Sequence, residues 1–311
     1  MIRDPYGRPV TNLRISLTQR CNLNCFYCHR EGQTGATRPT EMTADEVATI
    51  VRVASKLGIR KIKLTGGEPL LRDDIIEVVH KISQIEGIQE VSMTTNGTLL
   101  PSMAEKLTEA GLNRVNISLD TLNPTKYKEI TGHPFLDRVL DGIRSAVDAG
   151  LNPVKLNMLL LRGVNEDEVW DMVDFASKAG VILQIIELVS APSVGNDVFT
   201  RYHVDPKPIE EKLRRMAVRV VVRRMHHRRK YFLPNGAEVE VVRPMHNTEF
   251  CANCTRIRLT SDGKLKPCLL RNDNLVDILT PLRRGADEEQ LKQIFIKAIM
   301  LRKPYFTTRQ R

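Results

Sequence analysis

The chain has 311 residues, of which 41% are hydrophobic and 27% charged, the balance of a globular protein with one large core and an appended unit. No apolar run reaches the roughly 20 residues that a membrane helix needs, and the N-terminal residues lack the apolar region of a secretory signal. We therefore expect a cytoplasmic protein that spans no membrane.

Basic residues outnumber acidic ones by 47 to 37, which gives a net charge of +10 and suggests an acidic substrate or partner. Much of this excess falls within Arg214–Lys230. The stretch is compatible with a nucleotide triphosphate, with nucleic acid or with a solvated face.

The first two-thirds of the chain alternate β-rich apolar runs with helical patterns. Strands are predicted at Leu13–Thr18, Lys61–Thr65, Glu90–Thr94, Arg114–Leu119, Val154–Leu160 and Ile182–Leu188. Helices are predicted at about 43–57, 72–86, 101–110, 124–149 and 165–179. A glycine able to close a helix in the left-handed conformation follows each of the five, at Gly58, Gly87, Gly111, Gly150 and Gly180.

Alternation of strands and helices requires parallel strand pairing, in an incomplete (β/α) barrel or an open sheet. Both folds bind ligands at the carboxyl ends of their strands. Polar and glycine-rich residues gather there, including Gly66–Pro69 after the second strand and Thr94–Gly97 after the third. Turn residues also collect at strand ends for purely structural reasons.

The last third changes character. Asn235-Gly236 predicts a hairpin turn within Leu233–Val239, and a helix is expected near Asp287–Leu301. We place a boundary near Pro206–Pro208, which divides the chain into an α/β domain at residues 1–206 and a C-terminal domain at 207–311.

The first of two cysteine groups, Cys21-x3-Cys25-x2-Cys28, follows the first predicted strand. Three thiolates on one loop suit a [4Fe–4S] cluster and leave its fourth iron open to a substrate or cofactor. A Cys₃His zinc site is the alternative, but His29 is adjacent to Cys28 and poorly directed for the same ion.

The second group consists of Cys251, Cys254 and Cys268. It again leaves an open position on a four-iron cluster. Zinc is a more serious alternative here, because His246 could complete a Cys₃His set.

The first group, together with Tyr27 and Gly66-Gly67-Glu68-Pro69, resembles the signature of the radical S-adenosylmethionine enzymes. The resemblance implies an incomplete (β/α)6 parallel barrel with a C-terminal α+β extension that carries a second cluster. It also implies that the open iron chelates S-adenosylmethionine and that one electron releases a 5′-deoxyadenosyl radical.

Cys251-x-x-Cys254-Thr-Arg-Ile-Arg-Leu, with Ser-Asp-Gly-Lys after it, resembles the MoaA family, the GTP 3′,8-cyclases. Asn116–Asp120 and Gly7-Arg8-Pro9 extend the likeness. The resemblance implies two [4Fe–4S] clusters and conversion of GTP to 3′,8-cyclo-7,8-dihydro-GTP, the first step of molybdenum cofactor biosynthesis. It also implies a one-electron reductant such as ferredoxin or flavodoxin and a downstream cyclic pyranopterin monophosphate synthase, and it argues against nucleic acid as a partner.

The resemblance carries over residue by residue. It implies cluster ligands at Cys21, Cys25, Cys28, Cys251, Cys254 and Cys268. Contacts to S-adenosylmethionine are implied at Tyr27, Gly67, Ser118 and Val189. Contacts to GTP are implied at Arg14, Lys63, Thr94, Lys155, Arg256, Arg258 and the backbone of Ile257.

Several positions depart from the family pattern. Lys63 stands where relatives usually carry arginine, Val189 where they carry methionine, and Gln184 where they carry a basic residue. Many bacterial relatives end in a Gly-Gly pair, whereas this sequence ends Thr308–Arg311. Independently of the family, Lys155 within an apolar strand predicts contact with an anionic ligand, because a buried lysine is costly without an anion beside it.

Overall fold

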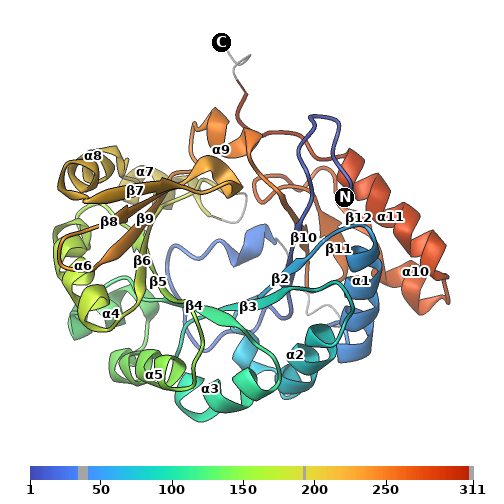
Figure 1. Cartoon of the computed structure of the whole chain (residues 1–311), viewed down its shortest axis with the longest axis horizontal. Coiled ribbons are helices and arrows are strands. Elements are labelled where there is room, and N and C mark those ends of the chain that lie inside the picture. The colour runs from blue at the N-terminus through green and yellow to red at the C-terminus, as the bar shows by residue number, and fades with distance from the viewer. Residues whose placement is uncertain (34–40, 192–193, 308–311) are drawn as a thin grey trace.

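The computed structural model describes residues 1–33, 41–191 and 194–307. Its strands curve into an open ring with most helices on the outside (Figure 1). The strands are β1 (Asn12–Ser16), β2 (Lys61–Thr65), β3 (Glu90–Thr95), β4 (Arg114–Ser118), β5 (Val154–Leu160), β6 (Ile182–Glu187), β7 (Arg219–Val222), β8 (Arg229–Phe232), β9 (Glu238–Val242), β10 (Arg256–Leu259), β11 (Lys264–Lys266) and β12 (Val276–Asp277).

The helices surround this ring. They are α1 (Ala44–Lys56), α2 (Ile75–Ser83), α3 (Leu100–Glu109), α4 (Pro124–Thr131), α5 (Leu136–Asp148), α6 (Val169–Lys178), α7 (Asn196–Tyr202), α8 (Lys207–Met216), α9 (Thr248–Ala252), α10 (Leu279–Arg283) and α11 (Glu288–Met300). Short 3₁₀ turns are η1 (Arg30–Gly32), η2 (Pro69–Leu71), η3 (Glu166–Glu168) and η4 (Met225–His227).

All these strands belong to one sheet, in the order β12-β11-β10-β1-β2-β3-β4-β5-β6-β9-β8-β7. The run from β10 through β1–β6 to β9 is parallel throughout. The predicted partial barrel is therefore confirmed. The residues beyond 206 also extend it, because β9 joins β6 at one edge and β10 joins β1 at the other.

The predicted strands match β1–β6 to within two residues at either end, and β8 and β9 form the hairpin expected around Asn235-Gly236. The single helix predicted at 124–149 is wrong. It is two helices, α4 and α5, because Gly132 takes a left-handed φ of 79° and Pro134 follows it. The glycines predicted to close helices, at 58, 87, 111, 150 and 180, all have positive φ.

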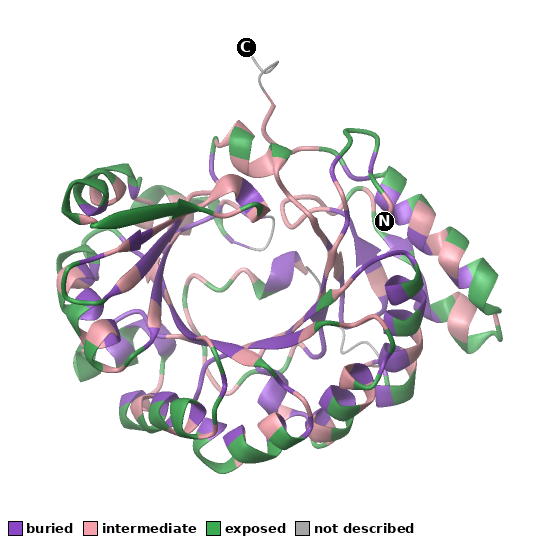
Figure 2. Ribbon diagram, in the orientation of Figure 1, coloured by how far each residue is buried: buried purple, intermediate pink, exposed green. Residues whose placement is uncertain are grey.

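The core lies between the sheet and the outer helices. In Figure 2 the strands of the ring are largely purple, whereas the surrounding helices carry purple beside green. Alternate residues of each strand, such as Leu13 and Ile15 of β1 or Ile62 and Leu64 of β2, are fully buried against this layer. The intervening residues point to the inside of the ring and are mostly polar or charged. The described residues contain no helix long and apolar enough to cross a membrane.

Candidate active site

The inside of the ring holds a cavity of about 430 Å³. Its lining includes all six cysteines, which come from opposite ends of the sequence. The lining also includes each residue that the resemblance assigned to S-adenosylmethionine, namely Tyr27, Gly67, Ser118 and Val189. Of the residues assigned to GTP, it includes Arg14, Lys63, Thr94, Lys155, Arg256 and Arg258. Ile257 is fully buried and is not among the lining residues, so its side chain does not face the cavity.

Strand register explains why so many cations meet in this cavity. Arg14 on β1 lies beside Arg258 of β10 on one side and beside Lys63 of β2 on the other. Neighbouring residues in parallel strands point to the same face, so these three cationic side chains form a row across the inner wall. Arg256 enters the same wall two residues earlier on β10.

Glu31 partly neutralises this row. Its carboxylate pairs with Arg14 at 2.5 Å and with Arg258 at 3.4 Å. Burial would raise the pKa of Glu31, but Arg14, His29 and Arg258 hold it down at about 2. One carboxylate thus serves two guanidinium groups, while the guanidinium of Arg256 has no side-chain hydrogen bond or ion pair to any described residue. The wall therefore keeps unmatched positive charge.

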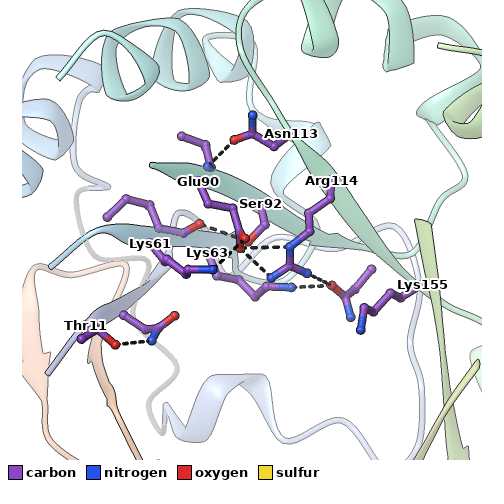
Figure 3. A network of polar contacts seen from close by, with 12 residues as sticks. Thr11, Lys61, Lys63, Glu90, Ser92, Asn113, Arg114 and Lys155 are labelled. Atoms are coloured by element: carbon purple, nitrogen blue, oxygen red, sulfur yellow. Dashed lines mark hydrogen bonds and ion pairs between the residues drawn. The ribbon is translucent and has the colours of Figure 1, made fainter. Parts of the chain in front are cut away.

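Lys63 of this row, next to Arg14 in the register, is drawn in Figure 3. Its Nζ donates to the Asn116 side-chain oxygen at 2.5 Å, a neutral acceptor. Burial, followed by repulsion from Arg114 and Arg14, lowers the pKa of Lys63 well below its usual value. An anion in the cavity would stabilise the charged form of Lys63.

Figure 3 also shows how Glu90 balances the charges at the base of this wall. It accepts from Lys61 at 3.1 Å and from Arg114 at 2.7 Å. These two cations are therefore paired within the protein, unlike Lys63.

Lys155 meets a carboxylate of the chain itself. Its Nζ lies 2.5 Å from Glu240 on β9, and both side chains are almost completely buried. Glu240 also accepts from Gln184 at 2.6 Å and from Arg223 at 3.0 Å. The buried lysine thus has an anionic neighbour in the protein itself, and the ligand contact predicted for Lys155 stays a prediction.

The first cysteine group lies on the loop after β1, which is held by the Gly66–Pro69 loop after β2. Backbone N–H groups of Gly67 and Glu68 donate to the carbonyls of Thr18 and Arg20, each at 2.7 Å. A Cβ on Gly67 would lie 2.1 Å from the Arg20 carbonyl oxygen, so only glycine fits there. The two loops therefore pack main chain against main chain immediately before Cys21.

Glu68 links this loop to the end of β3. Its buried carboxylate accepts from the Thr95 hydroxyl and the Asn96 N–H, each at 2.7 Å, and from the Leu70 N–H at 3.0 Å. Burial raises the pKa of Glu68 to about 7 despite these bonds. Asn96 in turn donates to the side chain of Asn22, next to Cys21.

Tyr27 is oriented by Asp120, which follows β4. The phenol donates to one carboxylate oxygen, and the Leu159 N–H donates to the other at 2.8 Å. Burial raises the pKa of Asp120 to about 6. Asp120 thus fixes an aromatic ring between two cysteines of the first group.

The second cysteine group is held by arginines from both ends of the chain. Arg8 donates to the Cys251 carbonyl at 2.8 Å, and Arg302 donates to the Cys254 carbonyl at 2.6 Å. Both arginines pair with Asp4, at 2.8 and 3.0 Å. Burial would raise the pKa of the Cys254 thiol, but Arg302 and Arg256 lower it below its ordinary value.

The donor chemistry of both groups fits an iron–sulfur cluster. All six cysteines are free thiols, and each group brings three to the cavity. No three His, Cys, Asp or Glu side chains among the described residues are arranged around a single metal ion. A cluster divides its ligands among several irons, so its thiolates stand further apart than those around one ion. His246 is exposed, packs on Phe306 and does not line the cavity.

The basic stretch Arg214–Lys230 is divided between surface and cavity. Val218–Val222 are exposed, whereas Arg223, Met225, His226 and Arg228 line the cavity. Sequence reasoning singled out this stretch but left its role open, because the contribution of these residues depends on β9 pairing with β6. The alternation of Glu238 and Glu240 with Val239 and Val241 was the available signal for a buried carboxylate. Thr308–Arg311 lie outside the described residues.

A parallel partial barrel with a three-cysteine loop after its first strand defines the class of radical S-adenosylmethionine proteins. Residues 15–176 match the family model described as Radical SAM superfamily, and residues 181–308 match that described as Molybdenum Cofactor Synthesis C. A solved structure of Streptococcus suis SuiB bound to S-adenosylmethionine superposes with a TM-score of 0.68 at 18% identity, over 92% of this chain and 68% of SuiB. That likeness shows the fold alone.

Curated relatives define the family more narrowly. A Pyrococcus horikoshii protein named "Probable GTP 3′,8-cyclase" is 56% identical over 99% of both chains. Proteins of the same name from Methanothermobacter thermautotrophicus and Methanocaldococcus jannaschii are 55% and 48% identical, each over 98% of this chain and 99% of theirs. The chain belongs to the GTP 3′,8-cyclase family of the radical SAM superfamily.

Proposed function

We propose that this protein converts GTP to 3′,8-cyclo-7,8-dihydro-GTP, the first step of molybdopterin biosynthesis. The observation that carries the proposal is that both three-cysteine groups open onto one cavity whose wall holds more cations than carboxylates. A nucleotide triphosphate matches that excess of positive charge. Family membership over the whole chain supports the same substrate.

Each cysteine group would hold one [4Fe–4S] cluster. The residues of the first are Cys21, Cys25 and Cys28, and those of the second are Cys251, Cys254 and Cys268. When bound, the first cluster supplies the electron that cleaves S-adenosylmethionine, and the second offers an open iron to the guanine. Tyr27, Gly67, Ser118 and Val189 would contact S-adenosylmethionine.

The residues of the cationic wall would bind and orient GTP. Arg14, Lys63, Lys155, Arg256 and Arg258 donate charged hydrogen bonds to phosphate oxygens, while Thr94 and the Ile257 backbone provide neutral contacts. Fixing ribose and base together is the main contribution of the protein, because ring closure requires C3′ to face C8.

The reaction balances with two electrons. Bound S-adenosylmethionine, cleaved by one electron to methionine, would supply the 5′-deoxyadenosyl group that removes the C3′ hydrogen and leaves as 5′-deoxyadenosine. The C3′ radical then forms a bond to C8, and one further electron and one proton complete the dihydropurine. A ferredoxin or flavodoxin would supply both electrons in the cytoplasm, and a cyclic pyranopterin monophosphate synthase would consume the product.

The experiment is an anaerobic reconstitution with iron and sulfide, followed by dithionite and S-adenosylmethionine, with and without GTP. We expect about eight irons per chain, release of 5′-deoxyadenosine, and a cyclised GTP product by mass spectrometry. Deoxyadenosine without a GTP product would retain the radical chemistry and reject the substrate. Bound zinc without cleavage of S-adenosylmethionine would reject the enzyme.

Arg256→Ala tests the cationic wall. The variant should lose cyclisation by at least 100-fold yet still release 5′-deoxyadenosine, because its first cysteine group is unaltered; a loss of this size corresponds to about 2.7 kcal/mol. Arg224→Ala is the matched control, since Arg224 is exposed and does not line the cavity. If Arg256→Ala binds and cyclises GTP like the parent protein, the assignment of Arg256 is wrong.

A further inference from the structure

Four cations surround a single buried carboxylate at the β9 side of the cavity. Glu240 is fully buried, with Lys155 at 2.5 Å, Arg223 at 3.0 Å, Arg228 at 3.7 Å and Lys230 at 3.8 Å. Lys230 also pairs with Glu238. Lys155, Arg223 and Arg228 are therefore left to share one negative charge.

These three cations line the cavity, whereas Glu240 lies behind them. Burial would raise the pKa of Glu240, but Lys155, Arg228 and Arg223 hold it at about 2. The carboxylate therefore stays ionised and anchors the cations at neutral pH. Its single charge leaves the remainder of their charge directed at the cavity.

Arg228 shows the shortage of partners most clearly. Its side chain is 11% exposed, and its buried Nε has no hydrogen-bond partner among the described residues. Burial lowers the pKa of Arg228 to about 10, with Glu240 opposing the shift and Arg223 and Arg114 adding to it. A guanidinium in this setting lacks the hydrogen bonds that normally offset its burial.

The backbone that presents Arg223 and Arg228 is strained. His226 and His227 in η4 have φ of 61° and 51°, in the left-handed region that non-glycine residues rarely occupy. The turn returns the chain so that the Arg223 N–H donates to the Arg228 carbonyl at 2.7 Å. Strain of this kind clusters at ligand-binding sites, where the surrounding contacts hold it.

Those contacts come from the second cysteine loop. The His226 N–H donates to the carbonyl of Asn253 at 2.9 Å, and its ring stacks on Phe250 at 3.8 Å between centroids. Asn253 lies between Cys251 and Cys254. The turn is therefore tied to the loop that would carry the second cluster.

We propose that Arg223 and Arg228, anchored by Glu240, form a second cationic wall that binds the phosphate groups of the nucleotide substrate, opposite the wall made by Arg14, Lys63 and Arg258. The inference rests on the proposed function and adds two phosphate-binding residues from the turn between β7 and β8. Gln184, which donates to Glu240, occupies a neighbouring register position on β6. Arg223 and Arg228 of the turn thus join Lys155 in supplying the positive charge at this edge of the cavity.

The test compares Arg223→Gln/Arg228→Gln with the control Arg224→Gln, which removes an exposed neighbouring charge. GTP binding to cluster-loaded protein is measured by anaerobic calorimetry, with inorganic tripolyphosphate and guanosine as separate competitors. In the double variant we expect affinity for GTP and for tripolyphosphate to fall at least tenfold, with guanosine competition unchanged. The control should stay within twofold of the parent protein for all three.

Arg223→Lys/Arg228→Lys keeps both charges and should recover most of the tripolyphosphate affinity. Iron content and thermal unfolding identify a variant that fails to fold. If the double variant fails, tripolyphosphate affinity is measured on Arg223→Gln alone, because Arg223 is partly exposed. Unchanged tripolyphosphate affinity, or an equal loss for guanosine and tripolyphosphate, would overturn the inference. The parent protein tests the proposed function by itself: if it cleaves S-adenosylmethionine but neither binds nor cyclises GTP, that function fails. If the parent protein binds GTP and only the variants behave differently from expectation, the inference alone fails.

Discussion

Lys155 illustrates how one residue can serve both the fold and the site. Its ammonium pairs with Glu240 and at the same time lines the cavity. Burial lowers the pKa of Lys155 to about 8, opposed by Glu240 and assisted by Arg223 and Lys230. Its charge is therefore sensitive to pH near 8.

The pH dependence of GTP binding follows from this pKa. Bound phosphate would raise the pKa of Lys155, so its contribution is complete below pH 8 and is lost as pH rises through 8 toward the higher value of the complex. We expect GTP affinity to fall by up to tenfold between pH 7.5 and 9 in calorimetric titrations. Lys155→Arg should remove most of this fall, and an equally steep profile in that variant would contradict the prediction.

At this scale the sequence predicted residue types better than partners. From the cost of a buried charge, the sequence predicts that Lys155 contacts an anionic ligand, whereas the anion beside it in the structure is Glu240. Glu240 lies 85 positions further along the chain and reaches Lys155 only because β9 pairs with β6, which in turn pairs with β5. Local patterns contain no information about that pairing.

Among the elements, the loops after β1 and β2 behave as a unit. The Gly66–Pro69 loop donates main-chain hydrogen bonds to Thr18 and Arg20, and Glu68 ties it to the end of β3. The sequence was sufficient to predict these strands, because their apolar runs are bounded by turns. It could not separate α4 from α5, since both carry helical periodicity and only the interruption at Gly132 divides them.

Gly67→Ala tests the close packing of the two loops. A Cβ would lie 2.1 Å from the Arg20 carbonyl oxygen, which is main chain and cannot move alone, so the cysteine loop must shift. We expect cleavage of S-adenosylmethionine to fall at least tenfold, measured as 5′-deoxyadenosine release. Gly195→Ala is the matched control, because nothing lies within 4 Å of its added Cβ and its φ is −58°. Parent-like cleavage by Gly67→Ala would show that this packing is dispensable.

Across the whole molecule, the two ends of the chain meet at the second cysteine group. Asp4 is buried and binds Arg8 and Arg302, which also donate to the carbonyls of Cys251 and Cys254. Removing the single carboxylate would leave two buried guanidinium groups without a counter-charge. Loss of one partner from a buried ion pair costs about 3–5 kcal/mol, which is enough to loosen the loop that they hold.

Asp4→Asn should therefore affect the two cysteine groups unequally. The first group has no contact with Asp4, so 5′-deoxyadenosine release should persist, while iron content falls from about eight toward four per chain and cyclisation is lost. Asp45→Asn is the control, because Asp45 is exposed on α1 and pairs only with Lys81 among the described residues. Iron analysis and electron paramagnetic resonance of the reduced protein distinguish the two clusters. Equal loss of iron from both clusters would mean that Asp4 supports the fold as a whole. If Asp4 anchors only the second cysteine loop, the second cluster is lost first.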